Sequence, residues 1–426
     1  MLAWALWDWG TQPWNTVVTT FVFSVYLVGP SFGSANHTAY VQSVCMTVAS
    51  VAIALIAPVL GQNTDRTGRT MSTLRVLTWA VALINAALFL IADEPAYLWA
   101  GFVMLGLGTV ASEVAGSVYN GVLDRVSTPR NVGRVSGLGW GMGYLGGIVA
   151  LMIIYVGFIA PDVGLFGVTA EHGMAVRTAM LLCGAWTLVF TIPTFLVLRD
   201  DPAPRGSRLG VLDSYRALLA TIVRLWRHDR RVVWFLLASA LFRDGLTGIF
   251  TYGGALARNT FGFSAGQVVV FGAAANVIAG VATICSGRLD DRVGPRAVIV
   301  GSLVMLVALA TTVFVLHSGG STVFWVLGLA LCVFVGPAQA ASRSYLARII
   351  PPGSSGEIFG LYATTGRVAS PLAPLMFGLC VGLGARLTGA ENTQYFGIVG
   401  IAVVLAAGLL VLLAKVPKVT AGAARD

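Results

Sequence analysis

Apolar segments of about 20 residues follow one another along almost the whole 426-residue chain. Each segment is long enough to cross the ~30 Å hydrocarbon core of a bilayer as a helix. Hydrophobic residues make up 57% of the sequence and charged residues only 11%, far below the charged fraction usual in soluble domains. Because a helix satisfies its backbone polar groups internally, these segments predict an all-α polytopic membrane protein.

The apolar segments predict twelve transmembrane helices in two sets of six. The first set is expected at residues 3–28, 40–60, 72–92, 97–121, 134–158 and 174–197. The second set is expected at residues 232–256, 265–286, 296–316, 322–346, 357–383 and 394–415. We therefore expect an N-terminal six-helix bundle (1–197), a cytoplasmic linker (198–231) and a C-terminal six-helix bundle (232–426).

The basic residues predict an orientation. The loops after helices 2, 4 and 8 are rich in arginine, whereas the segments 29–39, 159–173 and 317–321 contain neither Lys nor Arg. Basic loops remain on the cytoplasmic side of a membrane, so both termini are expected in the cytoplasm. The net charge of +9 then reports orientation, and we expect no nucleic-acid partner.

The linker has the pattern of an amphipathic helix. Apolar residues recur there at helical spacing: Leu212, Tyr215, Leu219, Ile222 and Trp226. Three arginines lie off this stripe: Arg216, Arg224 and Arg227. Such a helix is expected to lie along the inner membrane surface, and a regulatory docking segment is the alternative.

Six ionisable residues fall inside predicted helices: Asp8, Glu113, Arg243, Asp244, Arg343 and Arg367. Such residues are costly at membrane depth unless they face a cavity or a partner, so they are candidate functional residues. Polar neighbours at helical spacing complete a stripe on each of helices 1, 4, 7 and 10: Gln12 and Asn15, then Asn120, then Thr251, and then Gln339. These stripes predict a solvated central cavity.

Within this predicted cavity, Asp8, Asp244 and Glu113 are the candidates to carry protons. The alternative is that each acid pairs with an arginine. Arg343 lies near the inner end of its helix, so it has an alternative as well, which is to extend to the membrane interface.

The fifth predicted helix has two series of glycines at four-residue spacing, Gly133 to Gly141 and Gly139 to Gly147. Small residues at this spacing allow close helix packing, and we favour a static packing role. The sequence contains no phosphate-binding loop or nucleophile elbow, and its four histidines lack metal-ligand spacing. We expect neither an enzyme nor a cofactor or metal site.

A polar peptide between helices 2 and 3, Gly61-Gln62-Asn63-Thr64-Asp65-Arg66-Thr67-Gly68-Arg69, has a second copy. The copy begins at Gly287, and its Gly, Asp291, Arg292 and Gly294 recur at a constant offset of 226 residues. The repeat indicates two duplicated halves. In the copy, Pro295 replaces the last arginine, which favours a shared fold over a shared gating role.

The Gly61–Arg69 peptide resembles the G-x-x-x-D-R-x-G-R signature of the major facilitator superfamily. The resemblance implies two six-helix bundles related by a pseudo-two-fold axis, and it implies that Asp65 lies at the start of helix 11, near Glu357. A carboxylate is favourable beside a helix N-terminus. The implied cytoplasmic gate comprises Gly61, Asp65, Arg66, Gly68, Arg69, Arg134, Asp291 and Arg292.

Several segments are similar to the UMF1/Atg22-like family within that superfamily. They are Trp7-Asp8-Trp9-Gly10, Gly133 to Trp140, Arg243-Asp244-Gly245, Ser342-Arg343-Ser344 and Phe359-Gly360-Leu361-Tyr362. Eukaryotic members of that family export amino acids from the vacuole. This chain departs from the family at Thr11-Gln12-Pro13-Trp14 and at Arg367, where a lysine is common; Pro13 is expected to kink helix 1.

The resemblance implies a monomeric secondary transporter of a bacterial plasma membrane that works by alternating access. The leading expectation is proton-coupled export of a small polar solute, with amino acids as the first class. One alternative is efflux of hydrophobic drugs or lipids by proton antiport. Another is a sensor or scaffold without transport, against which the charges retained on helices 1, 4, 7 and 10 argue.

Overall fold

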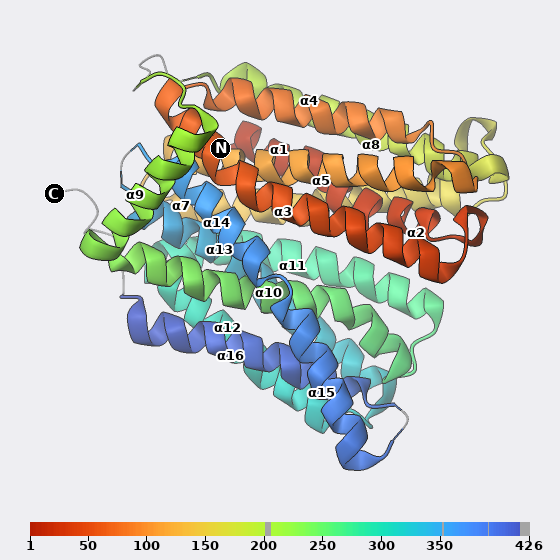
Figure 1. Cartoon of the computed structure of the whole chain (residues 1–426). Coiled ribbons are helices and arrows are strands. Elements are labelled where there is room, and N and C mark those ends of the chain that lie inside the picture. The colour runs from red at the N-terminus through yellow and green to blue at the C-terminus, as the bar shows by residue number, and fades with distance from the viewer. Residues whose placement is uncertain (201–205, 352, 391, 418–426) are drawn as a thin grey trace. The chain divides into compact units, whose positions relative to one another are not determined.

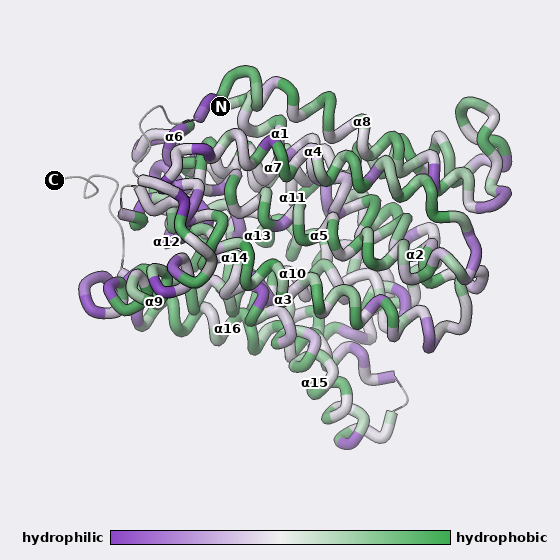
Figure 2. Tube along the Cα trace, turned by 45° about the horizontal axis from the view of Figure 1, so that its top comes forward, coloured by the Kyte–Doolittle hydropathy of each residue, from purple (hydrophilic) through white to green (hydrophobic). Residues whose placement is uncertain are grey.

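Long apolar segments become long helices in the computed structural model, which describes residues 1–200, 206–351, 353–390 and 392–417. Within that part of the chain, eleven helices are long and apolar enough to cross a membrane. Figure 2 shows hydrophobic residues along these helices and hydrophilic residues near their ends and on α9. The predicted all-α polytopic fold is confirmed.

The chain folds as two units, and Figure 1 follows their helices along the sequence. Unit 1 comprises Met1–Val122, Met142–Ser214 and Gly356–Ala363. Within it, α3 packs against α5, α4 packs against α5 and α8, and α1 packs against α8. Its helices are α1 (Leu2–Pro13), α2 (Phe23–Leu27), α3 (Ala35–Thr67), α4 (Thr70–Leu88), α5 (Leu98–Gly121) and α8 (Met174–Val197), with parts of α7, α9 and α14.

Unit 2 comprises Leu123–Gly141, Tyr215–Ser355 and the residues from Thr364 onward. Within it, α13 packs against α10, α11 and α12, and α16 packs against α10, α12 and α15. Its helices are α6 (Leu123–Val126), α10 (Arg230–Asn259), α11 (Ala265–Val293), α12 (Pro295–Val315), α13 (Gly320–Ile349), α15 (Leu372–Thr388) and α16 (Gly397–Lys415), with the other parts of α7 (Val132–Ile154), α9 (Val211–His228) and α14 (Ser355–Ala369).

The first predicted helix, residues 3–28, is interrupted. It consists of α1, a π-helical stretch (Trp14–Phe21) and α2. Pro13 has no N–H to donate to the carbonyl of Trp9, and that carbonyl instead accepts a hydrogen bond from the indole of Trp186 (3.2 Å). The interruption thus follows Pro13, where the sequence predicts a kink.

The eleventh predicted helix, residues 357–383, is also two helices. It divides into α14 and α15 at Ser370 and Pro371. Ser370 and Pro371 keep right-handed helical backbone angles, but Pro371 cannot donate the backbone hydrogen bond that a continuous helix needs. The predicted transmembrane helix thus corresponds to one span, Ser355–Thr388, and the interruption within it was not predicted.

The repeated polar peptide is mostly helical and not a loop. Helix α3 continues to Thr67, seven residues past its predicted end, so only Gly68 and Arg69 form the turn to α4. Gly68 ends the helix in the left-handed conformation (φ 69°), which a glycine adopts without steric cost. Asp65 is consequently held on the last turn of α3. The amphipathic helix predicted in the linker is confirmed as α9.

Candidate functional site

In unit 1, the carboxylate of Asp65 binds the first turn of α14. Its Oδ1 accepts from the backbone N–H of Gly356 and its Oδ2 from that of Glu357, both at 2.9 Å. The first N–H groups of a helix have no partner within the helix, and they carry the positive end of its dipole. The contact that the superfamily resemblance implies for Asp65 is therefore present.

Two glycines allow this approach. A Cβ added to Gly356 would lie 2.6 Å from the carbonyl oxygen of Gly61, and one added to Gly360 would lie 2.5 Å from the Cα of Pro58. Real Cβ atoms do not come that close to a backbone. Helices α3 and α14 are therefore in backbone contact, and Asp65 closes the end of that contact. We call this the α3–α14 latch.

Unit 2 contains the same arrangement, built from the second copy of the peptide. The carboxylate of Asp291, at the end of α11, accepts from the N–H groups of Gly133 (2.8 Å) and Arg134 (3.1 Å) at the start of α7. A Cβ added to Gly287 would lie 2.8 Å from the carbonyl oxygen of Gly133. This is the α7–α11 latch. Asp291 and the first glycine suffice to form this contact, although Pro295 replaces the last arginine of the motif.

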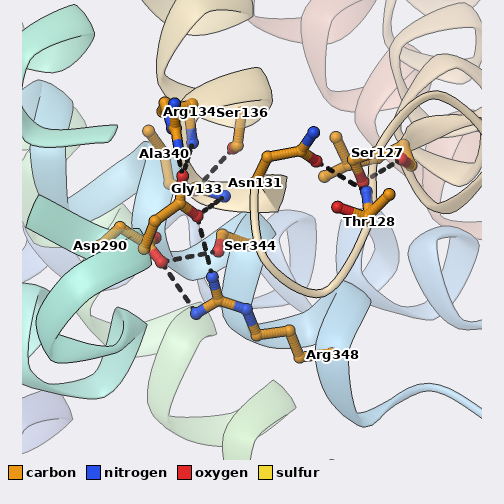
Figure 3. Close-up of polar contacts among 12 residues, drawn as sticks. Ser127, Thr128, Asn131, Gly133, Arg134, Ser136, Asp290, Ala340, Ser344 and Arg348 are labelled. Carbon is orange, nitrogen blue, oxygen red and sulfur yellow. Dashed lines mark hydrogen bonds and ion pairs between the residues drawn. The ribbon is translucent and has the colours of Figure 1, made fainter. Parts of the chain in front are cut away.

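Charged side chains reinforce the α7–α11 latch. The Nε of Arg134 lies 3.0 Å from Asp291, and Arg348 bridges Asp291 (3.2 Å) and Asp290 (2.9 Å). Asp290 is only 2% exposed and also accepts from the hydroxyl of Ser344 (3.1 Å). Figure 3 shows Asp290, Ser344 and Arg348 converging below Gly133. A buried carboxylate needs such partners, because its lost hydration is otherwise costly.

The remaining predicted gate arginines do not contact Asp65. Arg66 donates from Nε to the carbonyl of Ser207 in the linker (3.2 Å), and its own carbonyl accepts from Gly206 (2.9 Å). Arg69 and Arg292 are exposed. Arg134, which the sequence offers as a partner for the Asp65 latch, belongs to the latch of unit 2.

Inside unit 1, Asp8 is held by Tyr119. The Tyr119 hydroxyl lies 2.9 Å from Oδ2 of Asp8 and 3.1 Å from the carbonyl oxygen of Trp4. The Tyr119 ring stacks on Trp4 and Trp7, with centroid separations of 4.4 and 4.2 Å. This packing fixes the tyrosine and, through it, the carboxylate of Asp8.

The other polar residues predicted for unit 1 differ in their exposure. Gln12 is half-buried, and a Cβ on Gly143 would be 3.7 Å from both Asp8 and Gln12. Glu113 and Asn120 are half-buried on α5, and Asn15 is exposed in the π-helical stretch.

In unit 2, Asp244 of α10 is 7% exposed and caps a helix within the membrane-spanning region. Its Oδ2 accepts from the backbone N–H of Ala373 (2.6 Å), in the first turn of α15. The adjacent Arg243 lies beside α14, since a Cβ on Gly366 would be 3.4 Å from its guanidinium nitrogens. The two residues thus flank the break in helix 11, with the anion at the N-terminus of α15 and the cation near the C-terminus of α14, as the helix dipoles favour.

Arg343 of α13 is 2% exposed and does not extend to the membrane interface. Its Nε donates to the hydroxyl of Ser136 (3.0 Å) and its Nη2 to the carbonyl of Ser136 (2.7 Å). The guanidinium also lies 5.7 Å from the ring centroid of Trp140. The interface alternative for Arg343 was therefore wrong. The other predicted residues of unit 2 lie on its helices: Gln339 and Arg367 are half-buried, and Thr251 is exposed.

The sequence did not single out Tyr119, Ser136, Asp290, Arg348 or Ala373. Asp290 stands next to Asp291 in the second copy, and this adjacency was an available signal. The backbone N–H of Ala373 leaves no trace in the side-chain sequence, because its use depends on where α15 begins.

The comparisons with known proteins agree on a family. The model of a family described as "Vacuole effluxer Atg22 like" matches residues 123–418. The chain belongs to this Atg22-like family. It is 25% identical over 422 residues to a Bacillus subtilis protein described as the uncharacterized MFS-type transporter YxiO, covering 98% of this chain and 95% of that protein.

A fungal relative, autophagy-related protein 22 of Yarrowia lipolytica, is 27% identical over 281 residues. This match covers 58% of the Atg22-like chain and 45% of the fungal protein. Among solved structures, the proton:xylose symporter XylE aligns with a TM-score of 0.73 at 14% identity, covering 99% of this chain and 96% of that one. The human organic anion transporter MFSD10 aligns with a TM-score of 0.71 at 18% identity, covering 96% and 98%. These likenesses show the major facilitator fold.

Proposed function

We propose that this Atg22-like protein is a proton-coupled secondary transporter that exports small polar solutes, with amino acids as the first class. The observation that carries the proposal is the pair of buried charges in unit 2, Asp244 on α10 and Arg343 on α13. These two helices pack against each other. Buried charges at membrane depth are functional by default.

The family supports the same direction of transport. The matched family model is described as a vacuole effluxer, and the relative with nearly full coverage carries the description of a transporter. Export from a bacterial cell corresponds to the plasma membrane, with the arginine-rich α3–α4 turn on the cytoplasmic side by the positive-inside rule. The protein then works as a monomer.

In the proposed cycle, the two latches are on the cytoplasmic side. Their hydrogen bonds break and re-form as the transporter alternates between its two states. Breaking the bonds of Asp65 frees the start of α14 from α3, and breaking those of Asp291 frees the start of α7 from α11. Each latch consists of a carboxylate on two backbone N–H groups, contacts that re-form without rearrangement within the helices. Such contacts suit a reversible gate.

In the proposed mechanism, proton binding to Asp244 changes its contact with the start of α15. A protonated carboxyl group is a weaker acceptor than a carboxylate, so protonation of Asp244 loosens the cap on α15 and frees the break between α14 and α15. Asp8, held by Tyr119, and Glu113 are the candidates for a further proton site in unit 1. The central cavity formed by the predicted polar stripes remains part of this proposal.

Efflux of hydrophobic compounds is the alternative, and three aromatic residues of unit 1 bear on it. In unit 1, Trp9 stacks on Trp186 (centroids 6.0 Å apart), and Trp186 packs on Phe190 (4.5 Å). These rings are in contact with each other.

Flux into proteoliposomes tests the substrate class. With an imposed proton gradient, we expect accumulation of labelled amino acids well above that in empty liposomes, together with competition by unlabelled amino acids. Competition by hydrophobic cations alone would favour drug efflux. Flux of neither class would favour a sensor or scaffold.

A further inference from the structure

Helix α9 has two apolar faces. One is buried and contains Leu218 and Leu225, each 4% exposed, with Ser214 and Thr221 between them at helical spacing. The other is exposed: Leu212 is 64% exposed, Leu219 63%, Val223 48%, Trp226 44% and Ile222 38%. The stripe predicted from the sequence is therefore mainly this exposed face, and the protein itself uses a different face of the helix.

Arginines border the exposed apolar face. At 100° per residue, Arg216 and Arg227 fall next to Val223 on the helical wheel, and Arg224 falls about 60° beyond Arg227, past Ala220 and Asp213. Arg224 and Arg227 are exposed. Around the helix axis, the order is thus a protein-facing stripe, an exposed apolar stripe and an arginine stripe. A helix wholly in water would gain nothing from its middle stripe.

The linker before α9 is tied to a turn between two spanning helices. Asn63, near the end of α3, accepts from the N–H of Leu209 (2.9 Å) and donates to the hydroxyl of Ser214 (3.3 Å). Asp200 accepts from the N–H groups of Met71 (2.7 Å) and Ser72 (3.0 Å) at the start of α4. The start of α9 therefore lies at the level where α3 and α4 leave the bilayer.

The other end of α9 is placed by the chain itself. Helix α9 ends at His228, and the spanning helix α10 begins at Arg230. The 18 residues of α9 carry too many charges for a span, so the helix covers ~27 Å between two positions on one membrane face. A helix in this position runs along the boundary between lipid and water.

We propose that α9 is a binding site for anionic phospholipids. The exposed apolar stripe enters the boundary of the acyl chains, and Arg224 and Arg227 contact the negatively charged headgroups. Lipid bound there holds α9 in place and, through Ser214 and Leu209, the linker against Asn63 of α3. Asn63 is two residues before Asp65, so the lipid also supports the α3–α14 latch. The site goes beyond the proposed transport function and does not depend on it.

Hydrogen–deuterium exchange of the full-length protein in nanodiscs tests the site. The two lipids are phosphatidylcholine alone and phosphatidylcholine mixed with phosphatidylglycerol. We expect slower amide exchange in residues 211–228 with phosphatidylglycerol, and less slowing at high salt. The R224Q/R227Q double variant is expected to reduce the lipid-dependent ratio of exchange rates by up to roughly 30-fold.

The control is Arg208→Gln, which removes one positive charge from an exposed linker position outside α9; it is expected to leave the ratio unchanged. Equal exchange of residues 211–228 in both lipids would overturn the proposal. An equal effect of R208Q would do so as well. Protection that appears only with two proteins per nanodisc, whatever the lipid, would assign the apolar face to a second copy and also overturn it.

Discussion

At the scale of residues, one aspartate in each unit caps the start of a helix. Asp65 and Asp291 each accept from two consecutive backbone N–H groups at the start of a helix that crosses a neighbouring helix at glycines. A capping carboxylate of this kind contributes about 1–2 kcal/mol. That free energy is large enough to favour one state of a gate and small enough to be exchanged in each cycle.

Replacing Asp65 by alanine is expected to remove the cap on α14. Amide exchange of residues 356–359 should accelerate by roughly 5- to 30-fold, which corresponds to about 1–2 kcal/mol. Asp65→Asn retains a neutral acceptor and should give an intermediate rate. Unchanged exchange in Asp65→Ala would show that the glycine contact alone holds α14.

The individual charges differ in how far the sequence predicts them. The contact of Asp65 follows from the superfamily signature, because the motif fixes both its helix and its partner. The network of Asp290 and Arg348 does not, since hydrophobic periodicity places a charged residue at a helix end without indicating its partner. Arg343 shows the same limit: its position near a helix end is compatible with the interface, whereas the structure buries it against Ser136.

At the scale of elements, glycines decide which helices cross in contact. In unit 2, a Cβ on Gly137 would lie 2.7 Å from the carbonyl oxygen of Thr283, and one on Gly141 would lie 2.8 Å from that of Gly280. The second half of α7 instead meets α1 in unit 1, where a Cβ on Gly146 would lie 2.6 Å from the carbonyl of Trp9. The glycines of α7 thus pack against α11 in unit 2 and against α1 in unit 1.

The substitution Gly137→Ala is expected to force α7 and α11 apart and to cost about 1–3 kcal/mol. The matched control is Gly272→Ala on α11, where an added Cβ meets nothing within 4 Å. Because alanine favours a helix more than glycine does, the control should be neutral or stabilising by up to ~1 kcal/mol. Thermal unfolding in detergent compares the two. Equal melting temperatures for both variants would contradict close packing at Gly137.

The helices themselves are predicted well because their length is set by the bilayer, but the break in helix 11 is not. Pro371 separates α14 from α15, whereas Pro58, Pro193 and Pro337 lie inside the continuous helices α3, α8 and α13. A proline in an apolar segment therefore does not by itself locate a break. In helix 11, Asp244 caps the new N-terminus, and this tertiary contact cannot be seen in the local sequence.

At the scale of the whole molecule, we expect transport to depend on the break in helix 11 and on the charge beside it. The Atg22-like family and the major facilitator fold establish a membrane transporter. The proposed proton coupling depends on Asp244, whose carboxylate caps α15 where helix 11 is divided. Asparagine at this position keeps an oxygen acceptor for Ala373 but cannot ionise. The variant therefore loses proton binding and keeps the hydrogen bond that caps α15.

The most direct test is amino-acid flux into proteoliposomes that contain Asp244→Asn. We predict that accumulation driven by a proton gradient falls to the level of empty liposomes, whereas exchange of labelled for unlabelled amino acid without a gradient continues. The control Asp162→Asn, at an exposed loop position, should keep both activities. Accumulation by Asp244→Asn at the rate of the unchanged protein would contradict proton coupling through Asp244.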